Sequence, residues 1–337
     1  MFNFDEPRFV SIQSNAVEAG LAAHELVAGL VRDGARNLYF LGAGGAGVLM
    51  QPAAQLVQRL STFPAQVVHA AEILATDAVP LGVRSIVIIP SLSGTTSEAL
   101  DVLRFAKGKG ATVIALTGHL DTPVAREADH NFTVFAEDDT SSESFYLQSL
   151  LIVLALLDAT GDYDHYDRVA DELRTIPQLL LEAKRAFEPR AAEVAAAIKA
   201  HDFHIISGAG STWPEAWYYG TCILEEMQWI KTRPIHAADF FHGTLELLEE
   251  DTSLLLFKGE DASRILVERV EAWAPTVSRE IRTIDAAEVD LPGISADVRA
   301  LISQVVISTL LERVSAHLEE LTQHPLTTRR YYRQVAY

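Results

Sequence analysis

The chain has 337 residues, 49% of them hydrophobic, and a formal net charge of −19 from 46 acidic and 27 basic side chains. Its length exceeds the roughly 250 to 300 residues beyond which one hydrophobic core tends to divide, so two domains are expected. The acidic balance argues against nucleic acid as a partner, because phosphate backbones are bound by basic patches. The single cysteine, Cys222, excludes an intrachain disulfide and a multi-cysteine metal site, and it is compatible with a reducing cytosol.

Nothing in the sequence predicts a membrane partner. The apolar stretch Leu147 to Leu157 is well short of the ~20 residues that span a bilayer. The first residues, Met1 to Glu6, do not resemble the basic start of a signal peptide. We therefore expect a cytoplasmic protein without a membrane partner.

The first half of the chain alternates helical and strand patterns. Helical spacing covers residues 11–33, 98–109 and 142–159. Short apolar runs predict strands at residues 37–41, 65–68, 84–90, 112–117 and, more weakly, 131–135. Such alternation predicts an α/β fold in which a parallel sheet is flanked by helices on both faces.

The second half begins the same scheme again. A strand at 204–207 runs into Gly208 to Ser211, which mirrors the earlier step into Gly42 to Gly45. A helix at 215–228 and strands at 253–257 and 281–284 follow. We predict a first domain at 1–165, a helical connection at 166–200, a second domain of the same architecture at 201–323 and a C-terminal tail at 324–337.

The turn after the strand at 84–90 carries five hydroxyl residues and one glycine, in the order Ser91-Leu92-Ser93-Gly94-Thr95-Thr96-Ser97. In a parallel sheet, ligands bind beyond the carboxyl ends of the strands, where a helix start supplies N–H groups and a positive dipole end. We predict a phosphate site formed by Ser91, Ser93, Thr95 and Thr96. The alternative is helix capping, although a cap requires one hydroxyl rather than five.

A second glycine-rich turn, Gly42 to Gly47, resembles a dinucleotide fingerprint only weakly, because the acidic residue expected at the end of the next strand is missing. We therefore predict no cofactor. Gly44 and Gly45 are interpreted as sites of close backbone approach to a substrate, with a purely structural tight turn as the equal alternative.

Glu225, Glu226 and His242 are candidates for moving protons on a sugar carbon, since a carboxylate and an imidazole are the usual groups for that task. Taken alone, a glutamate is more often a solvated helix residue and a histidine a satisfied polar group. The other histidines show no metal-ligand spacing, so no metal is predicted.

Together these motifs resemble the tandem sugar isomerase (SIS) family, so we predict two tandem SIS domains. The hydroxyl turn, the glycine turn and the restart at Ile205 carry that likeness. Three further segments look like the fructosamine-6-phosphate deglycases, which include fructoselysine- and fructose-asparagine-6-phosphate deglycases; they are residues 224–229, 239–246 and 329–332. The likeness covers nearly the whole chain.

The resemblance implies that a 6-phosphorylated Amadori compound, a sugar phosphate joined to an amino acid, is converted with water to glucose 6-phosphate and the free amino acid. It implies acid and base roles for Glu226 and His242, with His242 assisting ring opening and Glu226 removing a proton from C1. It also implies a homodimer in which the histidine reaches the neighbouring subunit's site. Among further substrate contacts we predict Glu143 and Arg330. Arg329, Arg330 and Arg333 in the C-terminal tail are candidates to face a substrate carboxylate, although exposed arginines are more often solvated.

The chain departs from the family pattern in two places. Gly45 and Ala46 stand where relatives often have a hydroxyl residue that helps to bind the phosphate, so backbone N–H groups are expected to substitute. The motif His-Gly-Pro is replaced by His242-Gly243-Thr244, which we expect to change loop stiffness more than chemistry.

Two alternatives stay open. A ketose–aldose isomerase or aminotransferase-type enzyme would use the same phosphate turn without an amino-acid pocket. A non-catalytic sugar-phosphate sensor would bind the ligand without turning it over.

Overall fold

The computed structural model describes residues 1–332 and 334–335 of the chain. The chain divides into two compact units, an N-terminal unit of Asp5–Gln178 and a C-terminal unit of Met1–Phe4 and Leu179 onward. The division falls inside one long helix, α9 (Tyr166–Lys199), which covers nearly all of the segment expected to connect the domains.

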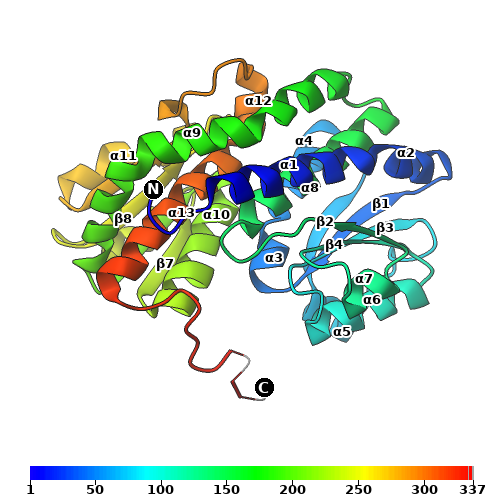
Figure 1. The fold of residues 1–337 in the computed structure, drawn as a ribbon, viewed down its shortest axis with the longest axis horizontal. Coiled ribbons are helices and arrows are strands. Elements are labelled where there is room, and N and C mark those ends of the chain that lie inside the picture. Colours follow the sequence, from blue (N-terminus) through cyan, green and yellow to red (C-terminus); the bar gives the residue numbers. More distant parts are fainter. Residues whose placement is uncertain (333, 336–337) are drawn as a thin grey trace. The chain divides into compact units, whose positions relative to one another are not determined.

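The N-terminal unit alternates strands and helices along its whole length (Figure 1). Its strands are β1 (Asn37–Gly42), β2 (Ala65–His69), β3 (Ser85–Ser91), β4 (Thr112–Thr117) and β5 (His130–Thr133). Its helices before α9 are α1 (Glu6–Ala22), α2 (His24–Arg32), α3 (Gly44–Val48), α4 (Gln51–Leu60), α5 (Ala70–Thr76), α6 (Ser97–Gly108), α7 (Pro123–Glu127) and α8 (Ser141–Thr160). The helix expected at 11–33 is thus two helices, α1 and α2.

The five strands form one parallel sheet in the order β2-β1-β3-β4-β5. Successive residues of a strand point to opposite faces, and both faces of the central strands are apolar. Tyr39, Val87 and Val113 belong to a buried cluster with α5, α6 and α7. The alternate positions, including Phe40 and Ile88, are also fully buried. Helices α1, α2, α4 and α8 lie on the other side of the sheet from α5, α6 and α7 (Figure 1). The predicted sheet with helices on both faces is confirmed.

Helix α8 is longer than the apolar stretch from which it was predicted. Its 20 residues are long and apolar enough to cross a membrane by length and composition, but 83% of its most apolar window is buried inside the protein. It packs against α1, α2 and α4. We therefore interpret α8 as the core helix of the N-terminal unit.

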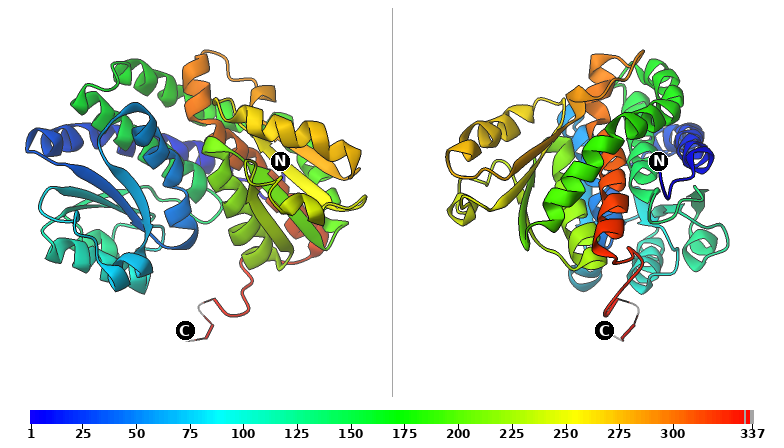
Figure 2. Two further views of the ribbon diagram at one scale, coloured as in Figure 1. Left: turned by 180° about the vertical axis from the view of Figure 1, so that it is seen from behind. Right: turned by 60° about the vertical axis from the view of Figure 1, so that its left-hand side comes forward.

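The C-terminal unit contains a second parallel sheet in the order β7-β6-β8-β9. Its strands are β6 (Phe203–Gly208), β7 (Lys231–His236), β8 (Ser253–Lys258) and β9 (Ile281–Asp285). Its α-helices after α9 are α10 (Trp213–Tyr218), α11 (Arg264–Trp273), α12 (Ala296–Leu301) and α13 (Ser303–Thr322). Helices α11 and α13 lie on opposite sides of this sheet (Figure 2).

Shorter helical turns complete the C-terminal unit. The π-helix η2 (Tyr219–Met227) continues α10, and 3-10 turns lie at η1 (Gly210–Thr212), η3 (Thr244–Leu247), η4 (Ala274–Thr276) and η5 (Ala286–Glu288). The strand order repeats that of β2-β1-β3-β4, so the two units share one topology over four strands.

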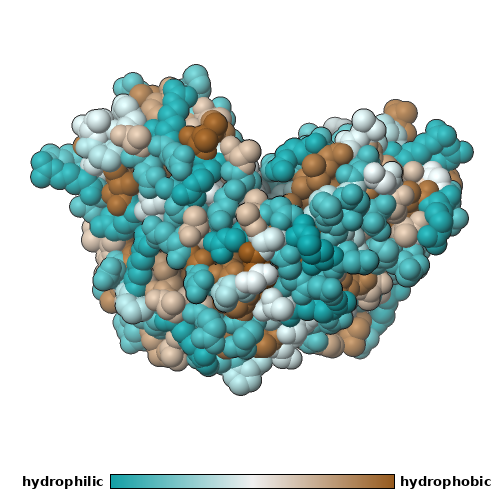
Figure 3. Space-filling view, turned by 90° about the horizontal axis from the view of Figure 1, so that it is seen from above, coloured by the Kyte–Doolittle hydropathy of each residue, from teal (hydrophilic) through white to brown (hydrophobic). Residues whose placement is uncertain are grey.

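Hydrophilic residues predominate on the face of the molecule drawn in Figure 3, and the apolar residues there form separate small groups. This agrees with the net charge of −19, which favours a well-hydrated surface.

Candidate functional site

The hydroxyl turn of the N-terminal unit joins β3 to α6, as predicted. Ser91 is the buried last residue of β3, and Gly94 reaches a φ of +62° that suits glycine. A Cβ at Gly94 would lie 2.1 Å from the Thr122 hydroxyl oxygen, so this position cannot carry a side chain without displacing Thr122. The Thr95 hydroxyl donates to Ser93 Oγ at 3.1 Å. The turn therefore gathers the hydroxyls of Ser93 and Thr95 at a helix N-terminus.

The capping alternative can be tested at Thr96, which occupies the N-cap position of α6. Within the described residues the Thr96 side chain makes no cap hydrogen bond to the first turn of the helix. The first N–H groups of an α-helix have no intrahelical acceptor and need an external one. The hydroxyl at the N-cap of α6 is thus not used for capping, which leaves these N–H groups open to water or to an anion.

The glycines of the turn after β1 have different surroundings. A Cβ at Gly42 would lie 2.6 Å from the Cα of Gly47, so these two glycines are needed for close packing within the turn. Gly44 has a φ of +53°, and no described atom lies within 4 Å of the position that its Cβ would take. Gly44 therefore borders open space, while Gly42 and Gly47 are structural.

Glu143 lies in the first turn of α8 and is 1% exposed. The Ser142 hydroxyl donates to its carboxylate at 3.2 Å. Its contact with substrate stays a prediction.

The C-terminal unit contains a pocket of about 590 Å³, and Glu226 is one of the residues that line it. The pocket is lined by Glu225, Glu226, Trp229, Ile230, Lys231, Thr232, Arg329, Arg330, Tyr331 and Tyr332. It thus brings together the end of η2, the start of β7 and the C-terminal segment 329–332. Two predicted site residues, Glu226 and Arg330, share it.

The two adjacent glutamates have different surroundings. Glu225 accepts hydrogen bonds from the Thr232 backbone N–H at 3.2 Å and hydroxyl at 2.6 Å, so it fastens η2 to β7. Glu226 is 35% exposed and accepts a hydrogen bond from Arg329 Nε at 2.9 Å. Both lie in a π-helix, a form that occurs frequently at functional sites. Both glutamates line the pocket, but Glu225 is held by Thr232 of β7, whereas Glu226 is held by Arg329 of the C-terminal segment.

Trp229 anchors the C-terminal segment to the end of η2. Its φ of +58° is unusual for a bulky residue and costs of order 1 to 3 kcal/mol in general. The His324 ring packs edge-on against the indole with 4.3 Å between centroids, and the Arg330 guanidinium lies 3.9 Å from the ring centroid. The Gln228 amide also donates to the His324 carbonyl at 2.7 Å. Segment 324–330 is therefore held over Glu226.

His242 lies in the turn that follows β7 and is exposed. Its backbone N–H donates to the Asp239 carbonyl at 2.9 Å, and Gly243 takes a φ of +129°. Thr244 is buried, and its hydroxyl accepts from Arg233 Nε at 3.1 Å, a contact that the proline of the family motif could not make. Within the described chain, His242 is not among the residues that line the Glu226 pocket, so the predicted pairing of these two side chains is not seen there.

Among the other histidines, His204 has structural surroundings. His204 is fully buried between Ser253 Oγ, 2.9 Å away, and the His201 carbonyl, and burial lowers the pKa of its imidazole to about 4. Among the described residues, no group of three or more histidine, cysteine, aspartate or glutamate side chains could hold a metal ion.

Sequence reasoning did not identify Trp229 or the ion pair of Arg329 with Glu226. These residues come together over a separation of 103 positions, and periodicity carries no signal for such a contact. Arg333, which was grouped with Arg329 and Arg330, lies outside the described residues.

Comparison with known proteins places this fold in a class. Residues 33–158 match the family model of the SIS domain. The two parallel sheets flanked by helices are the tandem SIS fold of the phosphosugar isomerases, and a crystal structure from Bacillus subtilis described as a phosphosugar isomerase superposes with a TM-score of 0.87. That structure is 28% identical in sequence and covers 95% of this chain and 99% of its own.

Two curated relatives are more specific. The fructosamine deglycase FrlB of Bacillus subtilis is 28% identical over 89% of this chain and 92% of its own length. A fructoselysine 6-phosphate deglycase of Escherichia coli O157:H7 is 23% identical over 92% of this chain and 89% of its own length. The likeness to deglycases that the motifs indicate is confirmed.

Proposed function

We propose that this chain is a sugar-phosphate enzyme of the SIS class, and more specifically a deglycase that converts a fructosyl-amino acid 6-phosphate and water to glucose 6-phosphate and the free amino acid. The observation that carries the proposal is the pocket in which Glu226 faces Arg329, Arg330 and Trp229. The similarity to a fructosamine deglycase over 89% of the chain supports the same reaction.

The phosphate is assigned to the hydroxyl turn of the N-terminal unit. The uncapped N-terminus of α6 and the hydroxyls of Ser93, Thr95 and Thr96 can supply hydrogen bonds to an anion. The open backbone at Gly44 allows a ligand to approach closely without a hydroxyl from the first turn. This binding mode needs no basic side chain, which agrees with the acidic composition of the chain.

The chemistry is assigned to Glu226 and His242. Glu226 takes a proton from C1 of the open-chain sugar, the electrons form a C1–C2 double bond, and His242 gives a proton to the C2 carbonyl oxygen. Return of a proton to C2 produces an imine at C1. Water adds to C1 and the carbon–nitrogen bond breaks, so glucose 6-phosphate and the amino acid leave. The substrate's own nitrogen and carbonyl make the C1 proton acidic, so no cofactor enters this scheme.

Arg329 and Arg330 are assigned to the amino-acid part of the substrate. Its carboxylate can pair with Arg330, which lies over Trp229, or draw Arg329 from its hydrogen bond with Glu226. The second route would release the carboxylate that acts as the base. Because Arg330 is stacked on an aromatic ring, its guanidinium is already ordered. It therefore loses less side-chain freedom on binding a carboxylate than a fully solvated arginine would.

His242 is exposed and does not line the Glu226 pocket within the described chain, which fits a homodimer in which it serves a neighbouring subunit. Mixing inactive Glu226→Gln and His242→Ala proteins tests this arrangement. Activity regained on mixing supports shared sites. Mixed dimers that form and stay inactive contradict them.

The substrate is tested with a panel of 6-phosphorylated Amadori compounds that differ in the amino acid, with glucose 6-phosphate release as the readout. The proposal predicts turnover of at least one member. Interconversion of fructose 6-phosphate and glucose 6-phosphate without Amadori turnover would identify an isomerase. Thermal stabilisation by these ligands without any product would identify a sensor.

A further inference from the structure

The turns of the two units correspond position by position. In each sheet the strand that ends in a glycine turn, β1 or β6, pairs with the strand that precedes the second turn, β3 or β8. That second turn runs from the last strand residue to the first helix residue over equal lengths, Ser91 to Ser97 and Lys258 to Arg264. Asp261 therefore stands at the place of Gly94, and Ser263 at the N-cap place of Thr96.

The turns after β1 and β6 differ in what lies beside their glycines, Gly44 and Gly210. Gly44 and Gly210 have nearly the same φ, +53° and +55°. The space that a Cβ would take is open at Gly44, whereas at Gly210 the Ser263 hydroxyl oxygen lies nearest to it and both carboxylate oxygens of Asp261 lie 2.8 Å from it. The region that is open in the N-terminal unit is therefore filled by the Asp261 carboxylate and the Ser263 hydroxyl in the C-terminal unit.

Asp261 is bound by the groups that would bind a ligand anion. One carboxylate oxygen accepts from the Ser211 N–H at 3.1 Å and hydroxyl at 2.7 Å. The other accepts from the Ser263 N–H at 2.8 Å and from the Ser263 hydroxyl. Burial by itself would raise the pKa of Asp261, but the hydrogen bonds from Ser263 and Ser211 outweigh it and hold the pKa below its ordinary value. Asp261 is 8% exposed, and each of its carboxylate oxygens accepts two hydrogen bonds.

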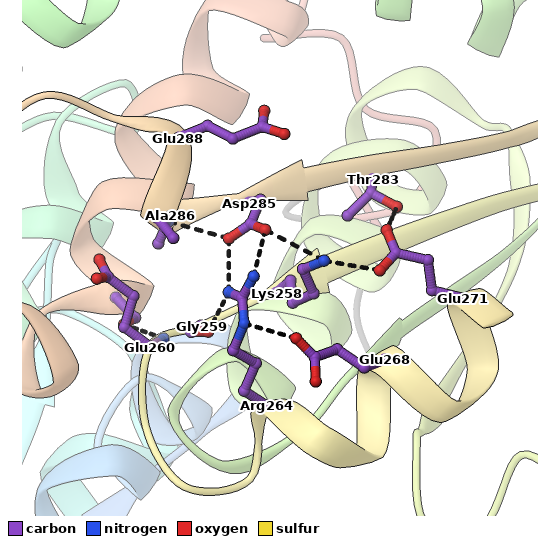
Figure 4. A network of polar contacts seen from close by, with 12 residues as sticks. Lys258, Gly259, Glu260, Arg264, Glu268, Glu271, Thr283, Asp285, Ala286 and Glu288 are labelled. Carbon is purple, nitrogen blue, oxygen red and sulfur yellow. Dashed lines mark hydrogen bonds and ion pairs between the residues drawn. The ribbon is translucent and has the colours of Figure 1, made fainter.

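The rest of this turn is also engaged within the unit (Figure 4). Lys258, at the place of Ser91, pairs with Glu271 at 2.6 Å and Asp285 at 3.2 Å. Arg264, at the place of Ser97, pairs with Asp285 at 2.6 Å. Positions that carry hydroxyls in the N-terminal unit carry paired charges here.

We propose that the Asp261 carboxylate is a built-in replacement for a ligand phosphate, so that the chain binds phosphate through its N-terminal unit alone and the anion site of its C-terminal unit is permanently filled. The comparison with the N-terminal turn rests on the proposed phosphate role of that turn. The filled state of the C-terminal turn rests on its own hydrogen bonds.

Asp261→Ala tests the proposal with inorganic phosphate as the probe. Removing the carboxylate leaves the N–H groups and hydroxyls of Ser211 and Ser263 around a space for an anion. We expect the variant to melt at a lower temperature without phosphate and to show roughly twice the phosphate-dependent rise in Tm of wild type, since two sites then bind. Adding Ser211→Ala and Ser263→Ala to the variant removes the extra rise.

Asp261→Asn is the matched control, because its amide still fills the space and excludes phosphate; its response to phosphate equals that of wild type. If Asp261→Ala does not fold by itself, refolding with and without phosphate gives the answer, and recovery that depends on phosphate supports the proposal. An equal phosphate response in Asp261→Ala and wild type overturns it. Release of glucose 6-phosphate is measured separately, so failure of the proposed reaction leaves this result interpretable.

Discussion

The two units share one strand order and differ in what their turns present. In the N-terminal unit, the turn after β3 ends in an uncapped helix, and Gly44 beside it borders open space. In the C-terminal unit, the matching turn is filled by Asp261, and the pocket lies elsewhere, beside η2 and β7. A shared architecture therefore does not carry a shared role, because the role depends on a few side chains at the turns. Five variants or conditions test this contrast.

Glu226→Gln should have the largest effect. A positioned proton-transfer group contributes roughly 10²- to 10⁴-fold to a rate, so we expect kcat for glucose 6-phosphate release to fall by that factor. Glu225→Gln is the neighbouring control. Its carboxylate contacts Thr232 rather than Arg329, and turnover should stay within a few-fold of wild type. Equal losses in both variants would remove the distinction between the two glutamates.

Acid should destabilise the C-terminal unit more than the N-terminal unit. His204 lies in β6 at the place that Leu38 has in β1, and its folded pKa of about 4 is below the ordinary value of about 6.5. The unfolded chain therefore takes up the proton first, so stability is complete above pH 6.5 and falls as the pH drops toward 4, by about 3 kcal/mol.

Urea denaturation between pH 7 and pH 4 measures this effect. His204→Leu, which copies the N-terminal unit, should flatten the dependence in that interval, even though it leaves the Ser253 hydroxyl without its partner. An unchanged pH dependence in this variant would show that other groups are responsible.

Thr96→Ala and Ser263→Ala form a matched pair at the N-cap positions of α6 and α11. A hydrogen bond to a charged group is worth about 1.5 to 3 kcal/mol, so Thr96→Ala should raise KM for the phosphorylated substrate by roughly 10- to 100-fold. Ser263→Ala should lower Tm and leave KM unchanged, because its hydroxyl serves Asp261. A reversed pattern would place the phosphate in the C-terminal unit.

Arg330→Ala should have a modest effect on the amino-acid part of the substrate. Arg330 is exposed, and exposed charge contacts contribute up to about 1 kcal/mol, so KM should rise by about fivefold. An Amadori compound made from an amine without a carboxylate should be unaffected. If both substrates lose equally, Arg330 supports the pocket through Trp229 instead of binding the carboxylate.

Thr244→Pro, which restores the family's His-Gly-Pro motif, should have the smallest effect on turnover. The substitution removes the hydrogen bond that Arg233 donates to the Thr244 hydroxyl, and this loss lowers the stability by about 1 kcal/mol. Thermal denaturation should show a small decrease in Tm with kcat nearly unchanged. A large loss of kcat would show that this turn positions His242.

Strands with continuous apolar runs could be predicted closely, and β4 matches its expected range of 112–117. β7 was missed because its sequence, Lys231 to His236, is polar and contains Pro234, which an edge strand tolerates. The helix expected at 215–228 is α10 followed by η2, because the π-helical hydrogen bonds depend on tertiary packing that spacing does not report.

For the site, the hydroxyl turn could be located from residue types alone, because hydroxyls and a glycine between a strand and a helix have few other uses. The contact of Arg329 with Glu226 could not, since it depends on where the chain returns after α13. The pair of Glu226 and His242 came from family likeness, and the structure assigns a pocket to the first of them only.

The most direct test of the central claim is a mass balance on one fructosamine 6-phosphate, measured with the purified chain. The account predicts equal amounts of glucose 6-phosphate and free amino acid, no turnover of the unphosphorylated compound, and a rate lowered by roughly 10²- to 10⁴-fold after Glu226→Gln. Equal rates with and without the phosphate, or product from fructose 6-phosphate alone, would contradict it.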